Sequence, residues 1–390
     1  MAEWKHVKIG DVCTVERGGS PRPIDKFITD DPNGINWIKI GDTTDSMYIT
    51  ETAQKIIPEG MKKSRYVQPG DFLLSNSMSF GRPYILKIDG CIHDGWLVLR
   101  DNDGIFDKRF LYYYLSSPST YQKFKNMAVG GVVNNLNSEM VRGVTVPVPT
   151  MEEQLSIVSA LDKVTELIAL RKEQLAKLDR LVKSRFIELF GDTGKQVPLT
   201  DYVWFQEGPG VRSADFTDDG TILLTGSNIN DNTISFGHKS DRHISNELAG
   251  GKYAHFMCDK DDILVVSSAI DPDKFDKKVV VVDVDKKYCL NTGIIRFKPN
   301  KQYLTLGYFR EFLKTDFFKH QVSSEMRGIA QMHFGPSHLK QMIILLPDSI
   351  ERQVEFESFV QQTDKSKLAI QQSLDKLELL KNSLMQEYFG

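Results

Sequence analysis

Two stretches of the chain, Gln154–Gly191 and Gln353–Gly390, have the hydrophobic spacing of long amphipathic helices. In each, apolar residues recur at intervals that alternate near three and four, so they fall on one narrow stripe of a helix. Polar and charged residues flank the stripe, which favours packing against a partner helix over burial in a broad core. The predicted seam comprises Leu161, Ile168, Leu175, Leu178 and Val182, and then Ile370, Leu374, Leu377, Leu380 and Leu384.

The two helical stretches are copies of one another. Gln154 aligns with Gln353, and the Phe-Gly pair at Phe190–Gly191 aligns without gaps with the pair at Phe389–Gly390. A pattern that recurs at one fixed offset over this length indicates internal duplication.

Capping sequences mark the start of both helices. Thr150 followed by Glu153 has the spacing of a capping box, and Asp348 followed by Glu351 is a looser version.

Each helix follows a globular segment with a repeated layout, first over residues 1–149 and then over 192–347. Asp262–Val265 corresponds to Asp71–Leu74, and Cys289–Gly293 corresponds to Cys91–Gly95. The scaffold pattern is repeated whereas the loop residues differ. In the first segment the pattern predicts strands at Trp4–Val15, Ile35–Ile40, Phe72–Leu74, Pro83–Ile88, Gly95–Arg100 and Val144–Pro149, and a helix over Phe110–Phe124 interrupted at Pro118.

Composition is that of an ordinary globular protein. At 390 residues, with 26% charged and 41% hydrophobic residues, the chain is long enough for two or three domains with their own cores. It has 49 basic and 52 acidic residues and a formal net charge of −3, which counts against a simple nucleic-acid binder. Any DNA binding must therefore depend on local patches, or on partners that supply positive charge.

Several other classes are disfavoured. The longest apolar runs are too short to span a bilayer and the N-terminal residues lack an apolar signal region, so we expect a cytoplasmic protein. The four cysteines form no CxxC pair, and the histidines show no metal-ligand spacing. Phosphate-binding loops, zinc-protease motifs and methyltransferase motifs are absent from the sequence. We therefore expect no catalytic site, no metal and no cofactor in this chain.

Three repeated features together resemble the specificity subunit of a type I restriction-modification system. One is PGDFLLSNSMSFGR at Pro69–Arg82, with a weaker echo at Asp261–Ser268. The second is the run at Gly130–Gln154, echoed at Arg327–Gln353. The third is the pair of long helices, each ending in Phe-Gly.

The resemblance implies an α+β fold of two α/β target-recognition domains separated by two long antiparallel, coiled-coil-like helices with pseudo-two-fold symmetry. The expected division is 1–149 and 192–347 for the domains, and 150–191 and 348–390 for the spacer helices. Each domain of such a subunit recognises one half of a bipartite double-stranded DNA site. The helices set the spacer and dock two methyltransferase subunits, and restriction-translocase subunits complete the complex. S-adenosylmethionine and ATP are then expected in those partners.

DNA contact requires Arg or Lys at phosphates and small polar, Asn or Arg side chains at base edges. These residue types gather in loops of both segments. The candidate contacts are Arg17, Ser20, Arg22, Ser75, Asn76, Ser77, Ser79, Arg82, Asn134 and Asn135 in the first segment, and Arg212, Asn228, Ser267, Ser268, Lys274, Lys277, Lys278, Asn291, Thr292, Arg327 and Gln331 in the second. For any one of them, a solvated loop is the competing interpretation.

Two alternatives remain open on the residues alone. The chain could be a protein-interaction scaffold whose helices bind helical partners. It could also be a metal-dependent nuclease built on Asp271, Asp283 and Asp285 with Lys286 or Lys287, although those acids and lysines also fit a hydrated turn after the apolar run Val279–Val282.

Overall fold

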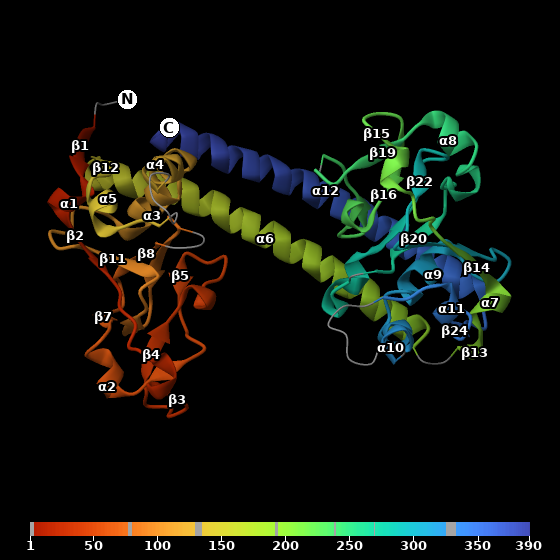
Figure 1. Ribbon diagram of the computed structural model, residues 1–390, viewed down its shortest axis with the longest axis horizontal. Coiled ribbons are helices and arrows are strands. Elements are labelled where there is room, and N and C mark those ends of the chain that lie inside the picture. The colour runs from red at the N-terminus through yellow and green to blue at the C-terminus, as the bar shows by residue number, and fades with distance from the viewer. Residues whose placement is uncertain are drawn as a thin grey trace. The chain divides into compact units, whose positions relative to one another are not determined.

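The computed structural model describes residues 4–76, 80–128, 135–191, 194–237, 239–268, 270–324 and 333–390 (Figure 1). The chain divides into two compact units. Unit 1 contains Met1–Lys172 and Gln371–Gly390, and unit 2 contains Glu173–Ile370. Each unit therefore holds one globular lobe and part of both long helices. We call the lobe that precedes the first long helix lobe one and the lobe between the two long helices lobe two.

Both predicted long helices are present. α6 runs over Met151–Leu189 and α12 over Ile350–Phe389, so α6 begins directly after its predicted capping residue, Thr150. The capping box of α6 is confirmed, because the Thr150 N–H donates to Glu153 Oε2 at 2.8 Å and the Glu153 N–H donates to Thr150 Oγ1 at 3.3 Å. No helix among the described residues is long and apolar enough to cross a membrane.

The predicted cap of α12 was placed one residue too early. Ser349, not Asp348, accepts the Arg352 N–H through its Oγ at 3.3 Å. Its hydroxyl also donates to Glu351 Oε2 at 2.7 Å. Serine and aspartate are both good capping residues, so the residue pattern does not decide between adjacent candidates.

Nine of the ten predicted seam positions are at least partly buried, and one is exposed. Leu161, Ile168, Val182 and Leu374 are buried, and Leu175, Leu178, Ile370, Leu377 and Leu384 are partly buried. Leu380, in contrast, is 46% exposed. Lys381, four residues after Leu377, takes the inward position with a partly buried side chain, and burial lowers the pKa of its amine. A lysine can cover apolar surface with its methylenes, which the pattern of apolar residues does not register.

Within each unit the two helical segments run antiparallel. In unit 1, Met385 and Phe389 share a hydrophobic cluster with Ile157 and Leu161, while Lys172 pairs with Glu378 at 3.5 Å. A later position on α6 thus meets an earlier one on α12. In unit 2 the same order holds, since Asp179 pairs with Lys367 and Arg185 pairs with Glu355 at 2.6 Å. The antiparallel packing that the family resemblance implied is present in both units.

Lobe one consists of two five-stranded sheets and short helices. The first sheet has the order β2-β11-β8-β9-β5 and the second has the order β3-β6-β4-β10-β7, while β1 pairs antiparallel with β12. The strands are β1 Lys5–Lys8, β2 Cys13–Arg17, β3 Ile28–Thr29, β4 Ile35–Ile38, β5 Tyr48–Ile49, β6 Lys55–Ile56, β7 Arg65–Val67, β8 Phe72–Ser75, β9 Pro83–Leu86, β10 Gly90–Ile92, β11 Trp96–Asp101 and β12 Thr145–Val148. The helices are α1 Ile9–Val12, α2 Pro58–Met61, α3 Lys108–Ser116, α4 Pro118–Ala128 and α5 Ser138–Arg142, with short 3₁₀ turns η1 Ile24–Lys26 and η2 Ile40–Asp42.

Lobe two repeats this order of elements. Its larger sheets are β14-β23-β20-β21 and β15-β19-β16-β22, while β13 pairs with β24 and β17 with β18. The strands are β13 Lys195–Pro198, β14 Val203–Glu207, β15 Phe216–Thr217, β16 Thr221–Leu224, β17 Ile229–Asn230, β18 Thr233–Ile234, β19 Arg242–Ile244, β20 Ile263–Val266, β21 Val279–Val281, β22 Tyr288–Leu290, β23 Ile294–Pro299 and β24 Ile343–Leu346. The helices are α7 Leu199–Tyr202, α8 Asn246–Gly250, α9 Leu306–Phe312, α10 Asp316–Ser324 and α11 Pro336–Leu339, with 3₁₀ turns η3 Ser213–Asp215, η4 Gly226–Asn228, η5 Ala254–Phe256 and η6 Pro272–Lys277.

Strand registers confirm the duplication. β10 lies parallel to β4 in lobe one, and β22 lies parallel to β16 in lobe two, whereas β11 and β23 each run antiparallel between two neighbours. The predicted strand over Trp4–Val15 was wrong in its middle, because α1 turns the chain between β1 and β2. The predicted helix over Phe110–Phe124 and its break near Pro118 are confirmed by α3 and α4.

Strand β11, which lies between β2 and β8 and which we call the central strand of lobe one, is buried on both faces; β23 is its counterpart in lobe two. Leu97 and Leu99 belong to the cluster that includes Phe110 and the helix α6, while Trp96 and Val98 belong to a second cluster on the opposite face. Alternate side chains of a strand point to opposite faces, so β11 supplies two cores at once.

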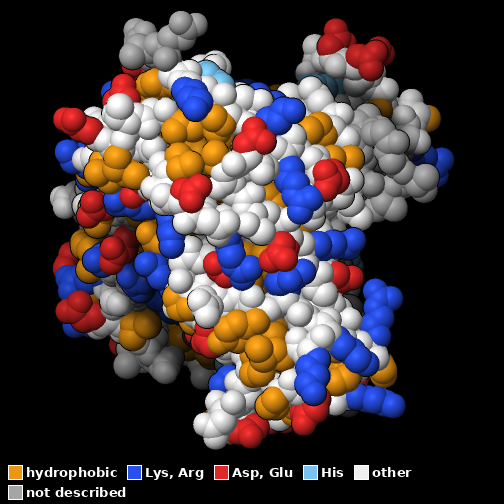
Figure 2. All heavy atoms as spheres, turned by 90° about the vertical axis from the view of Figure 1, so that its left-hand side faces the viewer, with side chains coloured by type: hydrophobic (Ala, Val, Ile, Leu, Met, Phe, Trp, Pro, Cys, Tyr) orange, Lys and Arg blue, Asp and Glu red, His pale blue; other side chains and the backbone are white. Residues whose placement is uncertain are grey.

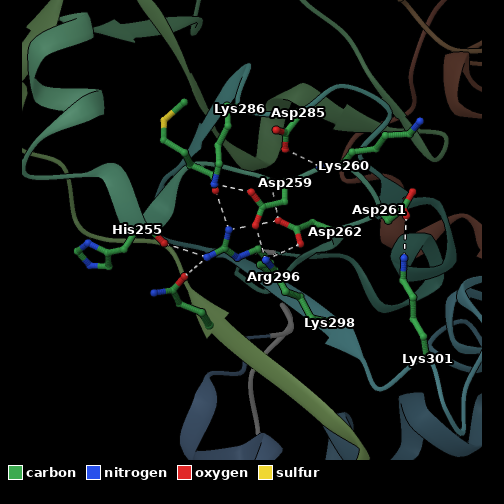
Figure 3. A network of polar contacts seen from close by, with 12 residues as sticks. His255, Asp259, Lys260, Asp261, Asp262, Asp285, Lys286, Arg296, Lys298 and Lys301 are labelled. Carbon is green, nitrogen blue, oxygen red and sulfur yellow. Dashed lines mark hydrogen bonds and ion pairs between the residues drawn. The ribbon is translucent and has the colours of Figure 1, made fainter.

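The central strand of each lobe carries an arginine bound by carboxylates and backbone carbonyls, although the two arginines lie two positions apart in the aligned strands. In lobe two, Arg296 on β23 is 4% exposed and donates to Asp262 Oδ2 at 3.2 Å, to the Met257 carbonyl at 2.7 Å and to the His255 carbonyl at 2.9 Å (Figure 3). It also donates to Gln206 on the neighbouring strand β14.

Arg100 on β11 of lobe one does the same. Its guanidinium donates to Asp71 at 2.8 Å, to Glu16 on β2 at 3.1 Å and to the Tyr66 carbonyl at 3.0 Å. Each arginine thus ties two strands and a turn together, and its charge is compensated where it is removed from water.

A second repeated contact joins each lobe to its long helix. The buried Gln154 side chain accepts the Asp107 N–H at 2.8 Å and donates to the Ile105 carbonyl at 3.0 Å and the Pro149 carbonyl at 3.1 Å. In lobe two the buried Gln353 accepts the Thr305 N–H at 2.9 Å and donates to the Tyr303 carbonyl at 2.9 Å. We call these contacts the glutamine bridges. Asp107 and Thr305 are the N-caps of α3 and α9, so each bridge fixes the aromatic helix against the long helix.

The glutamine bridges should make a measurable contribution to stability. We expect Gln154→Ala and Gln353→Ala each to lower the free energy of unfolding by roughly 1–3 kcal/mol, because each leaves a buried N–H and a buried carbonyl without a partner. Denaturant unfolding measures this loss. The control is Gln371→Ala on the exposed surface of α12, which should change stability little. Equal losses in all three variants would contradict the role assigned to the bridges.

Candidate nucleic-acid interface

In lobe one the loop after β10, His93–Gly95, brings three predicted DNA contacts together. Asp94 accepts through its backbone carbonyl from Arg17 Nε at 3.0 Å and from Asn76 Nδ2 at 2.9 Å. Its carboxylate accepts from Ser20 Oγ at 2.8 Å. The predicted loops at residues 17–22 and 75–82 therefore meet at this one aspartate.

Arg22 joins the same cluster, with Nη2 3.6 Å from Asp94 Oδ2. Its side chain is 83% exposed. A guanidinium that is lightly held and almost fully exposed is available to an incoming phosphate or base.

Glycine is required where the first loop crosses this cluster. A Cβ at Gly18 would lie 2.1 Å from the His93 carbonyl oxygen, and in lobe two a Cβ at Gly208 would lie 2.1 Å from the Asn291 carbonyl oxygen. The N–H of Gly18 donates to Trp96 and that of Gly208 donates to Ile294, at 2.9 and 3.0 Å. Both loops therefore approach the start of the central strand by the same backbone path.

The third predicted loop is tied to the second by a backbone hydrogen bond. The Leu136 N–H donates to the Asn76 carbonyl at 2.9 Å, which places the adjoining exposed Asn135 near this cluster. In lobe two the Phe334 N–H donates to the Ser267 carbonyl at 2.9 Å. Within each lobe, one equivalent backbone hydrogen bond thus ties the third loop to the second.

Burial divides the lobe-one candidates into two kinds. Arg17, Arg22 and Arg82 are exposed. Ser75 and Asn76 are 1% and 2% exposed, and the Ser75 hydroxyl accepts the Arg82 N–H at 2.9 Å. The arginines are available to a ligand, whereas Ser75 and Asn76 hold the loop in shape.

Electrostatics favour a charged Asp94 and a neutral His93. The hydrogen bond from Ser20 is the main cause that holds the pKa of Asp94 below its ordinary value of 3.8, with further contributions from His93 and Arg17. Burial lowers the pKa of His93, against a smaller opposing effect of Asp94. The carboxylate can therefore orient Ser20 and Arg22 at neutral pH.

Lobe two builds the corresponding cluster from different side chains. Asn291-Thr292-Gly293 stands where lobe one has His93-Asp94-Gly95. The Thr292 N–H donates to the Pro209 carbonyl at 2.9 Å, and the Ser267 N–H donates to the Gly293 carbonyl at 2.8 Å. Ser267 is fully buried. These hydrogen bonds bring together four of the predicted contacts: Asn291, Thr292, Ser267 and the adjoining Ser268. The loop that carries Arg212 begins beside them, because the Val211 N–H lies 3.4 Å from Asn291 Oδ1.

The remaining lobe-two candidates form a separate group around residues 228–232. Lys277 pairs with Asp231 at 3.2 Å, and Lys274 pairs with Asp271 at 3.4 Å. Lys278 donates to the Ile229 carbonyl at 2.9 Å. This group lies on other loops than the Asn291–Thr292 cluster.

Asn228 is fully buried and its amide is used by the fold. Its Oδ1 accepts the Thr225 N–H at 3.0 Å, and its Nδ2 donates to the Ser235 carbonyl at 3.1 Å and to Asp241 at 2.8 Å. Direct contact with a base would break all three bonds, so Asn228 supports the loop from behind. Five further candidates lie outside the described residues: Ser77, Ser79, Asn134, Arg327 and Gln331.

Three of the residues considered for a nuclease site have structural partners. Asp285 accepts the Lys260 N–H at 3.2 Å, and Lys286 pairs with Asp259 at the edge of the Arg296 anchor (Figure 3). Asp271 pairs with Lys274. Among the described residues, no group of three His, Cys, Asp or Glu side chains could hold a metal ion.

Sequence reasoning missed Asp94 and His93 as organisers of the site. The repeat of Cys91–Gly95 at Cys289–Gly293 was visible, and a polar pair between two buried strands was the available signal. What the sequence could not give is that the backbone carbonyl of Asp94, a group every residue carries, is the shared acceptor.

The surface matches the near-neutral composition. On the face drawn in Figure 2, Lys and Arg side chains are interspersed with Asp and Glu side chains and with patches of apolar residues. Phosphate contact must therefore come from individual exposed arginines and lysines such as those above.

A duplicated α+β lobe with clustered polar loops, followed in each copy by a long helix, defines a protein with two recognition modules. A family model, the type I restriction modification DNA specificity domain, matches residues 1–180 and 194–380. The chain therefore belongs to this family and carries two copies of its domain. This confirms the predicted class, a non-catalytic specificity subunit of a type I restriction-modification system, and its repeated α+β fold.

Two curated specificity subunits are similar to this chain in sequence. The type I restriction enzyme MjaVIII specificity subunit of Methanocaldococcus jannaschii is 21% identical over 367 residues, covering 88% of this chain and 82% of the relative. The putative type I restriction enzyme specificity subunit S.HindORF215P of Haemophilus influenzae is 29% identical over 183 residues, covering 44% of this chain and 45% of the relative.

Two solved structures share the fold over the whole chain. One, from work on complex assembly and conformational transition of the type I R-M system, has a TM-score of 0.58 at 17% identity and covers 100% of this chain and 98% of that one. The other, a type I restriction-modification S subunit from M. genitalium, has a TM-score of 0.55 at 14% identity and covers 100% and 96%.

The Asp94 carboxylate should control one loop and leave its neighbour unaffected. Asp94→Ala removes the acceptor of Ser20 and the partner of Arg22 but keeps the backbone carbonyl that binds Arg17 and Asn76. We expect faster amide hydrogen exchange at residues 18–22 and unchanged exchange at Leu136. Asp89→Ala, at another exposed carboxylate of lobe one, is the control.

The protection of the amides at residues 18–22 should also depend on pH. Because the pKa of Asp94 is depressed, its contribution is fully present above pH 3.8 and is lost as pH falls below that value towards the folded-state pKa. The protection factors of the amides at residues 18–22, from which the intrinsic pH dependence of exchange is removed, should therefore be constant near neutrality and fall only in acid. A fall in these protection factors between pH 5 and 7 would contradict the assignment, because a neighbour other than Asp94 would then be titrating.

Proposed function

We propose that each lobe recognises one half of a bipartite double-stranded DNA site. The observation that carries this proposal is that the two lobes share a backbone frame and differ in the side chains mounted on it. Gly18 and Gly208 follow the same path, and Asn76 and Ser267 accept the same backbone hydrogen bond. At the loop that organises each cluster, however, lobe one has Asp94 and lobe two has Thr292. One scaffold with two sets of polar loop residues suits two different half-sites.

The proposed contacts in lobe one are the exposed arginines and the loops they belong to. Arg17, Arg22 and Arg82 supply exposed guanidinium groups, which can bind phosphates or guanine bidentately. In lobe two, Arg212, Ser268 and the Asn291–Thr292 pair take these roles. The buried members of the predicted set, such as Ser75 and Asn228, shape the loops that present the exposed ones.

We further propose that the long helices set the distance between the half-sites. α6 has 39 residues and is about 58 Å long at ~1.5 Å per residue. This exceeds one turn of DNA, ~34 Å, so a helix of this length is compatible with half-sites one turn apart. Residues 1–149 and 192–347 would then be the recognition domains, with 150–191 and 348–390 as the spacer.

Two methyltransferase subunits are the proposed partners of the helices. Several apolar side chains on the helices are exposed, among them Leu181 at 48%, Leu368 at 61% and Leu379 at 71%. A docked partner would cover these side chains and remove them from water. The partners would carry S-adenosylmethionine, and restriction-translocase subunits would carry ATP. A complex of this kind that acts on DNA belongs in the cytoplasm, and its partners would supply the positive charge that this chain lacks.

The exposed leucines would equally serve a protein scaffold that does not bind DNA, so the decisive experiment concerns DNA sequence. The chain is assembled with its methyltransferase subunits, and bound duplexes are selected from a randomised library and sequenced. We expect two short fixed motifs separated by a gap of constant length. Arg17→Ala with Arg22→Ala should relax one motif only, whereas Arg212→Ala should relax only the other.

A mismatch in a recognised base pair costs roughly 1–3 kcal/mol, so the relaxed positions should be clear in the selected pool. Selection of no common sequence would favour the scaffold. Loss of both motifs from substitutions in one lobe would contradict the separate reading of half-sites.

Substitutions on the long helices of the full chain test the docking of the methyltransferase subunits. We expect Leu368→Glu and Leu379→Glu each to weaken assembly with the methyltransferase subunit at least about tenfold, because a charge would enter an apolar contact. Analytical ultracentrifugation or calorimetry measures the affinity. Gln371→Glu, on the exposed surface of the same helix, should keep the affinity, and all three variants should unfold at the wild-type temperature. Unchanged assembly in both leucine variants would place the partner elsewhere.

A further inference from the structure

Lobe one contains a cavity of about 430 Å³ that the proposed contacts do not use. It lies between the segment after η2, the turn that leads into β9, the end of α3 and the start of α4. Its lining residues are Thr44, Asp45, Ser46, Phe80, Gly81, Arg82, Pro83, Tyr84, Tyr112, Leu115, Ser116 and Tyr121. A volume of this size is within the range of small-molecule sites, roughly 300–1,000 Å³.

Aromatic rings form much of the cavity wall. Phe80 and Tyr121 stack with their centroids 5.9 Å apart and their planes at 16°, and Tyr121 is 44% exposed. Gly81 has a φ of +78°, and a Cβ there would lie 3.1 Å from Phe124. The turn that carries Phe80 can therefore press against α4 only with glycine at this position, which holds the stacked pair in place.

Two opposite charges stand among the rings. Arg82 and Asp45 are both exposed, and neither side chain forms an ion pair within the described residues. The cavity thus combines aromatic faces with a carboxylate acceptor, a cationic donor and the hydroxyl groups of serine, threonine and tyrosine residues. A nucleobase matches this combination, since rings stack on aromatic side chains, an exocyclic amino group can donate to a carboxylate, and a phosphate pairs with arginine.

Lobe two has a cavity of about 380 Å³ that borders the corresponding part of α9, but α6 supplies much of its lining, whereas no residue of α6 lines the cavity of lobe one. The N-caps Asp107 and Thr305 align α3 with α9, so Tyr112 corresponds to Arg310 and Ser116 corresponds to Lys314. The Arg310 guanidinium lies 3.3 Å from Asp364, and the Lys314 amine lies 2.9 Å from Glu311. Charged pairs replace the tyrosine and serine at these two positions, while Phe186, Phe312 and Phe317 supply the aromatic rings of this cavity.

We propose that the lobe-one cavity binds a single unstacked nucleobase. The inference rests on the proposed function, because it gives a DNA-recognition lobe a second point of contact. Arg82 belongs both to the cavity and to the loop of predicted DNA contacts at 75–82, which places the two sites side by side. The difference between the lobes argues against a protein side chain as the occupant. Two identical partner subunits would meet the same lining in both copies, whereas two different DNA half-sites would not.

A base in this cavity could come from a bound duplex or from a free nucleotide, and one fluorescence experiment separates the sources. The probe is 2-aminopurine, whose emission falls when the base stacks. The full chain is titrated with three ligands: a duplex with one unpaired 2-aminopurine, the same duplex fully paired, and free 2-aminopurine deoxynucleotide. We expect quenching and tighter binding for the unpaired base. Binding of the free nucleotide as tight as that of the duplex would make the nucleotide the source.

Variants assign the signal to the cavity. Tyr121→Ala should weaken binding of the unpaired base about tenfold, whereas Tyr121→Phe should keep it, because only the ring is needed for stacking. The matched control is Tyr303→Ala, which removes a tyrosine of similar exposure, 43%, from lobe two and should have no effect. The inference is overturned if wild type does not prefer the unpaired base, if Tyr121→Ala binds like wild type, or if Tyr303→Ala loses as much affinity.

A result against base binding in the cavity can be distinguished from a result against recognition of a bipartite DNA site. Selection of a bipartite paired sequence does not depend on Tyr121, so that result would stand even if the cavity bound no base. If no bipartite sequence is selected, the fault lies in the proposed function itself.

Discussion

The buried glutamine at the start of each long helix is the contact on which the architecture depends. Gln154 and Gln353 each accept the N–H of an N-cap residue and donate to carbonyls of the lobe. A lobe recognises a defined sequence at a defined distance only if it is fixed to its helix, and these amides fix it through hydrogen bonds that are shielded from water. Their exact repetition also shows that duplication copied the joint together with the lobe.

Within the lobes, the backbone framework is the same in both copies, whereas the side chains of the polar loops differ. Arg100 and Arg296 anchor the central strands with equivalent sets of partners, and the polar loops are linked by equivalent backbone hydrogen bonds. Backbone contacts place no demand on side-chain identity. The side chains at the tips can therefore change, as from Asp94 to Thr292, without loss of the frame that presents them. This is the physical basis for assigning two different half-sites to one chain.

Much of this organisation could be predicted from sequence, because it rests on periodic or repeated patterns. The long helices, the duplication and the two-lobed α+β fold all follow from such patterns. Leu380 shows the limit, because the stem of Lys381 covers the seam position that an apolar count assigns to leucine. Asn228 shows another, since its residue type suits base contact and yet its amide caps η4. The role of Asp94 required tertiary structure, because its decisive group is a backbone carbonyl. Which predicted loop residues touch DNA stays a prediction.

The central claim is that this chain determines where a methyltransferase acts. Genome-wide mapping of adenine methylation in cells that express the methyltransferase genes, with and without this chain, tests it most directly. The account predicts one bipartite methylated motif that appears only when the chain is present. An unchanged methylation pattern, with the methyltransferase shown to be expressed, would contradict it.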